Sequence, residues 1–307
     1  MGHDHAHHHH GVSADADRGK LVIALALIVG FMCVEVAAGI AAESLALISD
    51  AAHMLTDATA IALSLVAMQL ARRPARGAMT YGLGRSEILA AAVNGTTLLV
   101  LALIIVYEGI RRLVDPPATE GGIVLGIALV GVVVNLAAVW VLSRANRQSL
   151  NVEGAYQHIL TDLAAFVATA IAGAVIVLTG FTRADGIASL FVAAIMLRAA
   201  YGLLRASGRI FLEAAPEGVD PDAIGRAMVG AAGVVEVHDL HVWEVTSGFA
   251  ALSAHITVRE DADCHTARER VAAMLHDRFG IEHSTLQVDH EGGRLLTIEK
   301  QAPRSSA

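Results

Sequence analysis

The chain has 307 residues, of which 55% are hydrophobic and only 17% are charged, whereas roughly 25% of residues in a soluble domain are charged. The hydrophobic residues gather in blocks of about twenty, so the sequence predicts an α-helical protein that crosses a membrane several times. The whole net charge of −8 lies in residues 213–307, which hold 16 acidic and 8 basic residues. Such an acidic tail argues against a nucleic-acid partner.

Residues 1–20 form a polar segment that is rich in histidine. Six of the 15 histidines lie between His3 and His10. Tracts of this kind bind metal loosely and are usually disordered, so we predict a disordered tail here. The tract is either a purification tag or a natural segment, and the interruptions at Asp4 and Ala6 favour a natural segment.

Six apolar segments follow, each close to or above the roughly 20 residues that span a bilayer. They cover residues 21–42, 45–71, 86–114, 123–142, 152–179 and 184–206. Ten basic residues flank the segment ends on one side of the membrane and three flank them on the other. By the positive-inside rule, both termini are expected in the cytoplasm. We therefore predict a six-helix transmembrane domain over residues 21–210, embedded in the lipid bilayer.

Residues 211–298 have the pattern of a small cytoplasmic α+β domain in the order α-β-β-α-β. Pro221 follows Asp220 at a helix start, Ser247-Gly248 has the form of a hairpin turn, and Gly280 marks a helix end. The expected elements are a helix over 221–232, strands over 234–246 and 249–258, a helix over 264–279 and a strand over 284–289. Residues 299–307 are expected to be disordered.

Two of the apolar segments carry a histidine and an aspartate four residues apart, His53 with Asp57 and His158 with Asp162. Positions i and i+4 share one face of an α-helix, about one turn apart. No other histidine occurs between residues 11 and 237. Two such pairs facing each other would supply two nitrogens and two oxygens, which suits four-coordinate Zn²⁺.

Acidic side chains in a membrane segment are costly. Asp50, Asp57 and Asp162 together would cost about 8–10 kcal/mol on insertion scales, which is comparable to a typical folding free energy. A lone acid can instead pair locally within the helix bundle, but the duplicated spacing favours metal ligands. Asn94 and Asn135 are expected to form hydrogen bonds between helices. The pattern predicts a transport site for a divalent cation in mid-membrane.

The chain resembles the cation diffusion facilitators, in the zinc-exporting branch that includes bacterial cobalt-zinc-cadmium resistance exporters and animal zinc transporters. The matching motifs are Ser44–Asp57 (SLALISDAAHMLTD), Tyr81–Arg85 (YGLGR), His158–Asp162 (HILTD) and Val237–Trp243 (VHDLHVW). The resemblance implies six transmembrane helices, a homodimer, a metallochaperone-like cytoplasmic domain and exchange of metal for protons across a bacterial inner membrane. It also implies a transport site of His53, Asp57, His158 and Asp162, in which His53 favours zinc over manganese or iron.

The resemblance further implies that Zn²⁺ is a regulatory ligand of the tail. By position, it assigns His238, His255 and Asp289 to a cytoplasmic site, with His265, His241 and His283 as further candidates. Some family members have a histidine where this chain has Gln287, which leaves the ligand set open. Some also hold a metal in the second-to-third loop with Asp and His, but residues 72–84 contain neither, so we predict that this site is absent.

An intramembrane zinc hydrolase and a membrane-anchored zinc sensor are the alternatives to a transporter. An intramembrane zinc hydrolase would need an open coordination position and a general base, as in His-Glu-x-x-His, and the sequence has no such motif. A membrane-anchored zinc sensor would have no use for matched ligands in mid-membrane. We therefore predict a transporter and not an enzyme, while the choice among Zn²⁺, Cd²⁺ and Co²⁺ stays open.

Overall fold

The structure, a computed structural model, describes residues 14–41, 45–115 and 121–292, apart from the side chains of residues 14–16, 38–39, 41, 45–53 and 121–124. The chain forms two compact units. One unit runs up to Leu212 and includes Val245–Gly248, and the other comprises Glu213–Glu244 and the residues from Phe249 onward. The boundary predicted at residue 210 lies close to this division.

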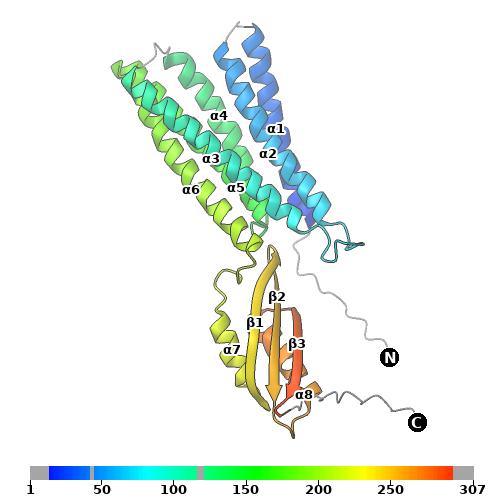
Figure 1. Cartoon of the computed structure of the whole chain (residues 1–307). Coiled ribbons are helices and arrows are strands. Elements are labelled where there is room, and N and C mark those ends of the chain that lie inside the picture. The colour runs from blue at the N-terminus through cyan, green and yellow to red at the C-terminus, as the bar shows by residue number, and fades with distance from the viewer. Residues whose placement is uncertain (1–13, 42–44, 116–120, 293–307) are drawn as a thin grey trace, which may run out of the picture. The chain divides into compact units, whose positions relative to one another are not determined.

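Six long helices lie side by side in the first unit (Figure 1). They are α1 (Ala14–Ala41), α2 (Leu45–Ala71), α3 (Arg85–Val114), α4 (Gly121–Leu142), α5 (Leu150–Thr179) and α6 (Ala184–Phe211). Within the described ranges, six helices are long and apolar enough to cross a membrane. The predicted polytopic architecture is therefore confirmed. The largest differences between predicted and observed helix bounds are at the start of α1, which begins at Ala14 and not at residue 21, and at the end of α6, which ends at Phe211 and not at residue 206.

Helix α1 begins at Ala14, so residues 14–20, which were predicted to belong to a disordered tail, are helical. The buried carboxylate of Asp17 explains this early start. Its Oδ1 accepts a hydrogen bond from the Asn146 main-chain amide at 3.0 Å and another from Lys20 Nζ at 3.2 Å. The first turns of α1 are thereby tied to the segment between α4 and α5. The histidine tract at residues 3–10 and the tail at 299–307 lie outside the described residues, so their predicted disorder stays a prediction.

Helices α3 and α6 approach each other closely at a pair of glycines. A Cβ atom at Gly186 would lie 3.0 Å from the main-chain oxygen of Gly109, and a Cβ at Gly109 would lie 3.0 Å from Leu190 Cδ2. Small residues allow membrane helices to come this close and to associate through van der Waals contact. Helix α5 in turn packs against α2, α3, α4 and α6, so it is the central helix of this unit.

The two asparagines singled out in the sequence make different hydrogen bonds. Asn94 Nδ2 on α3 donates to Ser64 Oγ on α2 at 3.3 Å, which is a bond between helices as predicted. Asn135 Nδ2 donates to the main-chain oxygen of Gly131 at 3.1 Å, one turn earlier in its own helix α4. Among the described residues, the structure therefore does not show the interhelical bond predicted for Asn135, because the side chain reaches back to the i−4 carbonyl instead.

The second unit has the predicted α-β-β-α-β order. Its elements are α7 (Pro221–Val229), β1 (Val234–Thr246), β2 (Phe249–Val258), α8 (Cys264–Phe279) and β3 (His283–His290). The strands form one sheet in the order β1-β2-β3. The two residues Ser247 and Gly248 join β1 to β2 as a hairpin, with Gly248 at a φ of +75°, whereas β2 and β3 are parallel and are connected through α8.

Both tail helices contribute to one hydrophobic core on one face of the sheet. Ile224 and Met228 of α7 and Val271 and Leu275 of α8 share this core with Leu252 of β2. Because successive side chains of a strand point to opposite faces, the residues that alternate with the buried positions of β2 lie on the other face of the sheet. His255 is one of them, so the open face of the sheet carries a candidate metal ligand.

Candidate functional site

Three metal-ligating side chains meet between α2 and α5 in the membrane unit. His158 Nε2 lies 2.8 Å from Asp57 Oδ1 and 4.0 Å from Asp162 Oδ2. Each residue offers one ligand atom, and these atoms lie within 4.8 Å of one another. The structure thus brings Asp57 of one helix to the His158–Asp162 pair of the other, across 101 positions of sequence.

Helix geometry explains how α5 presents its two ligands together. His158 and Asp162 are four residues apart in an unbroken helix, so their side chains project from the same face. His53 lies one turn before Asp57 in α2, but its side chain is outside the described residues. Its participation in the cluster therefore stays a prediction, as does that of the complete set of two histidines and two aspartates.

Two polar atoms of this cluster are buried and have no hydrogen-bond partner among the described residues. They are His158 Nδ1 and Asp162 Oδ2. A buried polar atom that lacks a partner costs about 1–3 kcal/mol, and more when it is charged. Intramembrane ionisable groups are retained where they act on an ion or a proton. Nitrogen and carboxylate donors in this arrangement match the ligands that Zn²⁺ takes in proteins.

A second group of potential ligands lies in the tail, on the open face of the sheet. Asp239 Oδ2 is 3.3 Å from His238 Nδ1 and 3.7 Å from His255 Nδ1. The two imidazole rings are 5.2 Å apart between centroids and meet edge to face. His238, Asp239 and His255 therefore form a three-residue cluster with the spacing that one metal ion requires.

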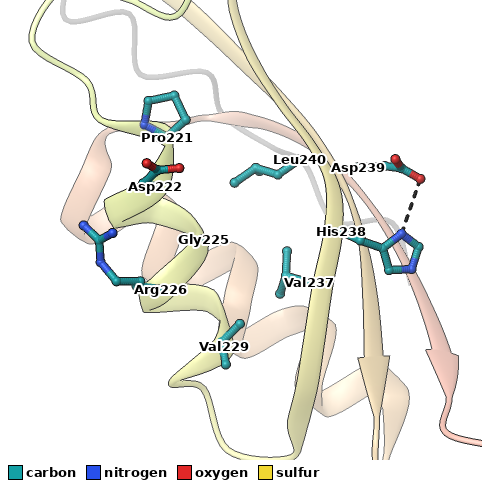
Figure 2. A pocket seen from close by; sticks show the side chains of 9 residues that line it. All are labelled: Pro221, Asp222, Gly225, Arg226, Val229, Val237, His238, Asp239 and Leu240. Atoms are coloured by element: carbon teal, nitrogen blue, oxygen red, sulfur yellow. Dashed lines mark hydrogen bonds and ion pairs between the residues drawn. The ribbon is translucent and has the colours of Figure 1, made fainter.

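A backbone irregularity in β1 makes this cluster possible. Neighbouring strand residues normally point to opposite faces, yet Figure 2 shows His238 and Asp239 on the same side of β1, while Val237 and Leu240 point toward α7. Asp239 has a φ of +49°, a left-handed conformation that Asp tolerates better than most residues. This left-handed residue departs from the regular strand conformation, so two adjacent potential ligands lie side by side.

The other candidate ligands of the tail lie apart from this cluster. Asp289 Oδ2 accepts a hydrogen bond from Gln287 Nε2 at 2.9 Å, and Gln287 is the residue that pairs with His255 in the parallel register. His283 packs edge to face on Phe249. His265 lies in the first turn of α8 and His241 lies on β1, and neither belongs to a group of potential ligands within the described residues.

Asp239 is the ligand candidate that sequence reasoning missed, whereas the part predicted for Asp289 in a tail site stays a prediction. The signal was present in the spacing of apolar residues along β1. Val237, Leu240 and Val242 all contribute to the tail core, so the spacing changes from three residues to two. A break in the two-residue period of a strand indicates a bulge, and Asp239 lies at that break.

A groove of about 590 Å³ lies beside this cluster, between α7 and β1 (Figure 2). Its wall includes Gly225, Val229, Val237 and Leu240, and His238 and Asp239 border it. Arg226 lies at its rim and pairs with Asp220 at 3.5 Å. The groove is lined by both polar and apolar residues, while the side chains of His238 and Asp239 lie on the side of β1 that faces away from α7.

Two family models match the chain. The model described as cation efflux transmembrane domain matches residues 21–212. The model described as cation efflux protein, cytoplasmic domain, matches residues 216–291. The two matches together cover both units of the structure.

Proteins of known function are similar to the chain along most of its length. It is 36% identical over 295 residues to the "Cadmium, cobalt and zinc/H(+)-K(+) antiporter" of Bacillus subtilis (strain 168), covering 95% of this chain and 93% of that protein. It is 39% identical over 274 residues to the "Metal cation efflux system protein CzcD" of Cupriavidus metallidurans, covering 88% and 86%. It is 36% identical over 293 residues to the "Zinc transporter ZitB" of Escherichia coli (strain K12), covering 95% and 93%.

Proposed function

The chain belongs to the cation diffusion facilitator family of cation efflux proteins, and we propose that it exports Zn²⁺ from the cytoplasm in exchange for protons. As a member of this family it is a multi-pass membrane transporter and not an enzyme. The observation that carries the proposal is the buried cluster of Asp57, His158 and Asp162 between two membrane-spanning helices. The names of two relatives support zinc as the ion, and His53 is proposed as the fourth ligand.

The proposed ligand set suits a transported ion in three ways. Two imidazoles and two carboxylates fill the four positions of Zn²⁺, so the site binds the ion and leaves no position open for catalysis. The two carboxylate charges balance the charge of the ion, which lowers the penalty for a charged group in a membrane. The absence of soft thiolate ligands favours exchange of the ion over its permanent retention.

The contact between His158 and Asp57 supports coupling to protons. At 2.8 Å, Nε2 and Oδ1 are at hydrogen-bond distance, and a proton must lie between two such atoms. A metal ion needs the lone pairs of both atoms, so its binding must release that proton. An imidazole ordinarily changes its charge between about pH 5 and 8. In the proposed cycle, Zn²⁺ displaces protons on the cytoplasmic side and protons displace Zn²⁺ on the outer side.

Zinc-driven proton flux in proteoliposomes tests this function. The purified chain is reconstituted with a pH-sensitive dye inside, and Zn²⁺ is added outside. We expect proton release from the wild type and none from Asp162→Ala or His53→Ala. Glu108→Ala is the matched control, because Glu108 is an acidic residue of α3 that pairs with Arg111 away from the cluster. Full flux in both ligand variants would reject the assigned site, and no flux in the wild type would reject proton exchange.

We also propose that the tail binds Zn²⁺ as a regulatory ligand in a homodimer. The support is the cluster of His238, Asp239 and His255, which supplies three ligands on the open face of the sheet and leaves the fourth position for water or another residue. Two tails of −8 each would bring a formal charge of −16 together. Bound zinc would reduce this repulsion and favour a closed pair of tails.

Distance measurements between spin labels on the two tails of the reconstituted protein test this regulation. Adding Zn²⁺ should shorten the distance in the wild type, and Asp239→Ala should blunt the change. A membrane-anchored zinc sensor is the alternative function, and it predicts the tail response without any zinc-driven proton flux.

We further propose that the protein lies in a bacterial inner membrane, with both termini in the cytoplasm. In this proposal residues 21–210 span the membrane and residues 211–298 form the regulatory domain.

A further inference from the structure

A second polar cluster is buried in the membrane unit, where it joins α2, α3 and α5. Asn151 Nδ2 on α5 donates to the main-chain oxygen of Ser64 on α2 at 2.7 Å. Asn94 Nδ2 on α3 donates to the hydroxyl of the same serine at 3.3 Å. All three residues are almost completely buried. Hydrogen bonds of this kind hold membrane helices together, since the lipid offers polar groups no alternative partner.

The bond from Asn151 lies in register with the metal cluster. Ser64 follows Asp57 by seven residues on α2, and Asn151 precedes His158 by seven residues on α5. In two antiparallel helices, equal offsets in opposite directions along the sequence place both contacts along the same interface. Seven residues are about two helical turns, or roughly 10 Å along the axis. The contacts Asp57–His158 and Ser64–Asn151 are therefore two rungs of the same α2–α5 interface.

Register matters strongly for the metal cluster. Moving α5 by one residue along α2 would turn His158 by about 100° around the helix axis, which would carry its imidazole away from Asp57. Apolar packing alone discriminates poorly between such neighbouring registers in a membrane, because lipid tails are as apolar as the helix surfaces. A buried polar pair specifies one register, since any other leaves its donor without a partner.

We propose that Asn151 is a positioning residue that holds α5 in the register at which His158 and Asp162 meet Asp57. The inference rests on the proposed transport site. Asn151 is buried although its Oδ1 has no hydrogen-bond partner among the described residues, so the chain keeps an incompletely satisfied amide there. Its Nδ2 donates to the main-chain carbonyl of Ser64. The position of this acceptor is fixed by the backbone of α2 and does not depend on the Ser64 side chain.

Binding of Co²⁺ to the purified full chain in detergent tests this role. Tetrahedral Co²⁺ absorbs visible light strongly, so the spectrum reports the geometry of the site as well as its affinity. The measurement uses a chain that carries His238→Ala, His255→Ala and alanine at the six histidines of residues 3–10, so that neither the tail cluster nor the histidine tract contributes. Asn151→Leu removes the donor at nearly constant volume. Asn135→Leu is the matched control, because it removes a buried amide whose hydrogen bond, among the described residues, is to a carbonyl of its own helix.

We expect Asn151→Leu to weaken Co²⁺ binding by roughly 3- to 20-fold, the range that measured interhelical hydrogen bonds correspond to, and to shift or weaken the tetrahedral bands. Asn135→Leu should leave both unchanged. Ser64→Ala should also keep the spectrum, because the main-chain acceptor of Asn151 remains. A merely structural role would lower stability in Asn151→Leu and leave the spectrum of the folded protein unaltered.

The outcomes separate this inference from the proposed transport site. If Asn151→Leu binds Co²⁺ with the wild-type affinity and spectrum while Asp162→Ala does not bind it, the positioning role is overturned and the site stands. If the wild type and Asp162→Ala bind Co²⁺ equally, the transport site is rejected and the positioning role falls with it. If Asn135→Leu alters the spectrum as much as Asn151→Leu, register at the α2–α5 interface is not the cause.

Discussion

The membrane unit and the tail each bring together histidine and aspartate side chains, but these side chains are buried in the membrane unit and exposed to solvent in the tail. In the membrane cluster the side chains of His158, Asp57 and Asp162 are 1%, 14% and 19% exposed. In the tail cluster those of His238, Asp239 and His255 are 48%, 67% and 43% exposed. The first cluster is built between two helices, whereas the second depends on one distorted strand and its neighbour.

This difference in burial implies a difference in role. An ion that enters the membrane cluster must shed its water, and charges that are buried there interact strongly with one another. In the proposed function, zinc and protons compete directly for the same atoms, which is what exchange requires. Ligands in the tail remain in contact with solvent, so zinc can bind and leave in response to its free concentration. This difference in burial supports the proposal that the first cluster moves the ion and the second senses it.

The largest expected effect is on zinc-driven proton flux, which should be lost when the membrane cluster is altered and kept when the tail cluster is altered. Asp57→Ala should reduce zinc-driven proton flux to the level of empty liposomes, because it removes a metal ligand and the partner of His158. Asp239→Ala should leave the flux measurable at saturating zinc and change only its dependence on zinc concentration. Initial rates over a range of zinc concentrations measure both effects. Equal loss of flux in the two variants would contradict the division of roles.

The next effect concerns the independence of the two units. Leu252 is fully buried in the tail core, and Leu→Ala substitutions at such positions cost about 2–5 kcal/mol. Leu252→Ala should therefore loosen the tail, seen as faster hydrogen exchange in β2 and α8, while tetrahedral Co²⁺ binding in the membrane unit persists. Val235→Ala, at an exposed position of β1, is the control. Loss of membrane-site binding in Leu252→Ala would show that the units depend on each other.

A smaller effect distinguishes the two acids of the tail. Asp239→Asn should lower the zinc affinity of the tail by about 10-fold or more, since even outer partners of metal ligands cost roughly 10–100-fold when removed. Asp289→Asn should change it little, because Asp289 hydrogen-bonds to Gln287 outside the cluster. Zinc titration of a full chain that carries Asp162→Ala and alanine at the six histidines of residues 3–10 measures the tail without the membrane cluster or the histidine tract. A larger effect at Asp289 would restore the ligand set implied by the family resemblance.

The smallest effect is a pH dependence of the tail. The hydrogen bond that His276 Nδ1–H donates to the Asp277 carboxylate, helped by the charges of Asp277 and Glu282, raises the pKa of His276 above its usual value. A group whose pKa is raised by folding stabilises the fold fully below its unfolded pKa, and this stability is lost as the pH rises through the folded pKa. His276→Gln and Asp277→Asn should therefore both make tail stability less sensitive to pH between about 5 and 8. Denaturation of the tail at several pH values checks this, and an unchanged pH dependence in either variant would contradict it.

The sequence by itself determined those features that are properties of a single helix or strand. Hydropathy located six spans because apolar length is a property of each segment, and the confirmed α-β-β-α-β order followed from turn residues and local periods. The pairing of His158 with Asp162 on one face of α5 likewise needed only the helical repeat of 3.6 residues. Asn135 marks the limit, because a lone buried amide can bond within its own helix or to another.

Only the tertiary structure decided which elements meet and how the backbone departs from regularity. It brought Asp57 to His158 across two helices, tied residues 14–20 into α1 through Asp17, and joined Asp239 to His238 through a left-handed residue in β1. The first two outcomes depend on packing between distant segments, which the period of a single element does not encode. The break in the apolar period of β1 indicated an irregular strand, but only the structure showed that it places Asp239 beside His238. A positive φ at Asp239 was enough to add an acidic candidate beside His238 that the sequence pattern had not indicated.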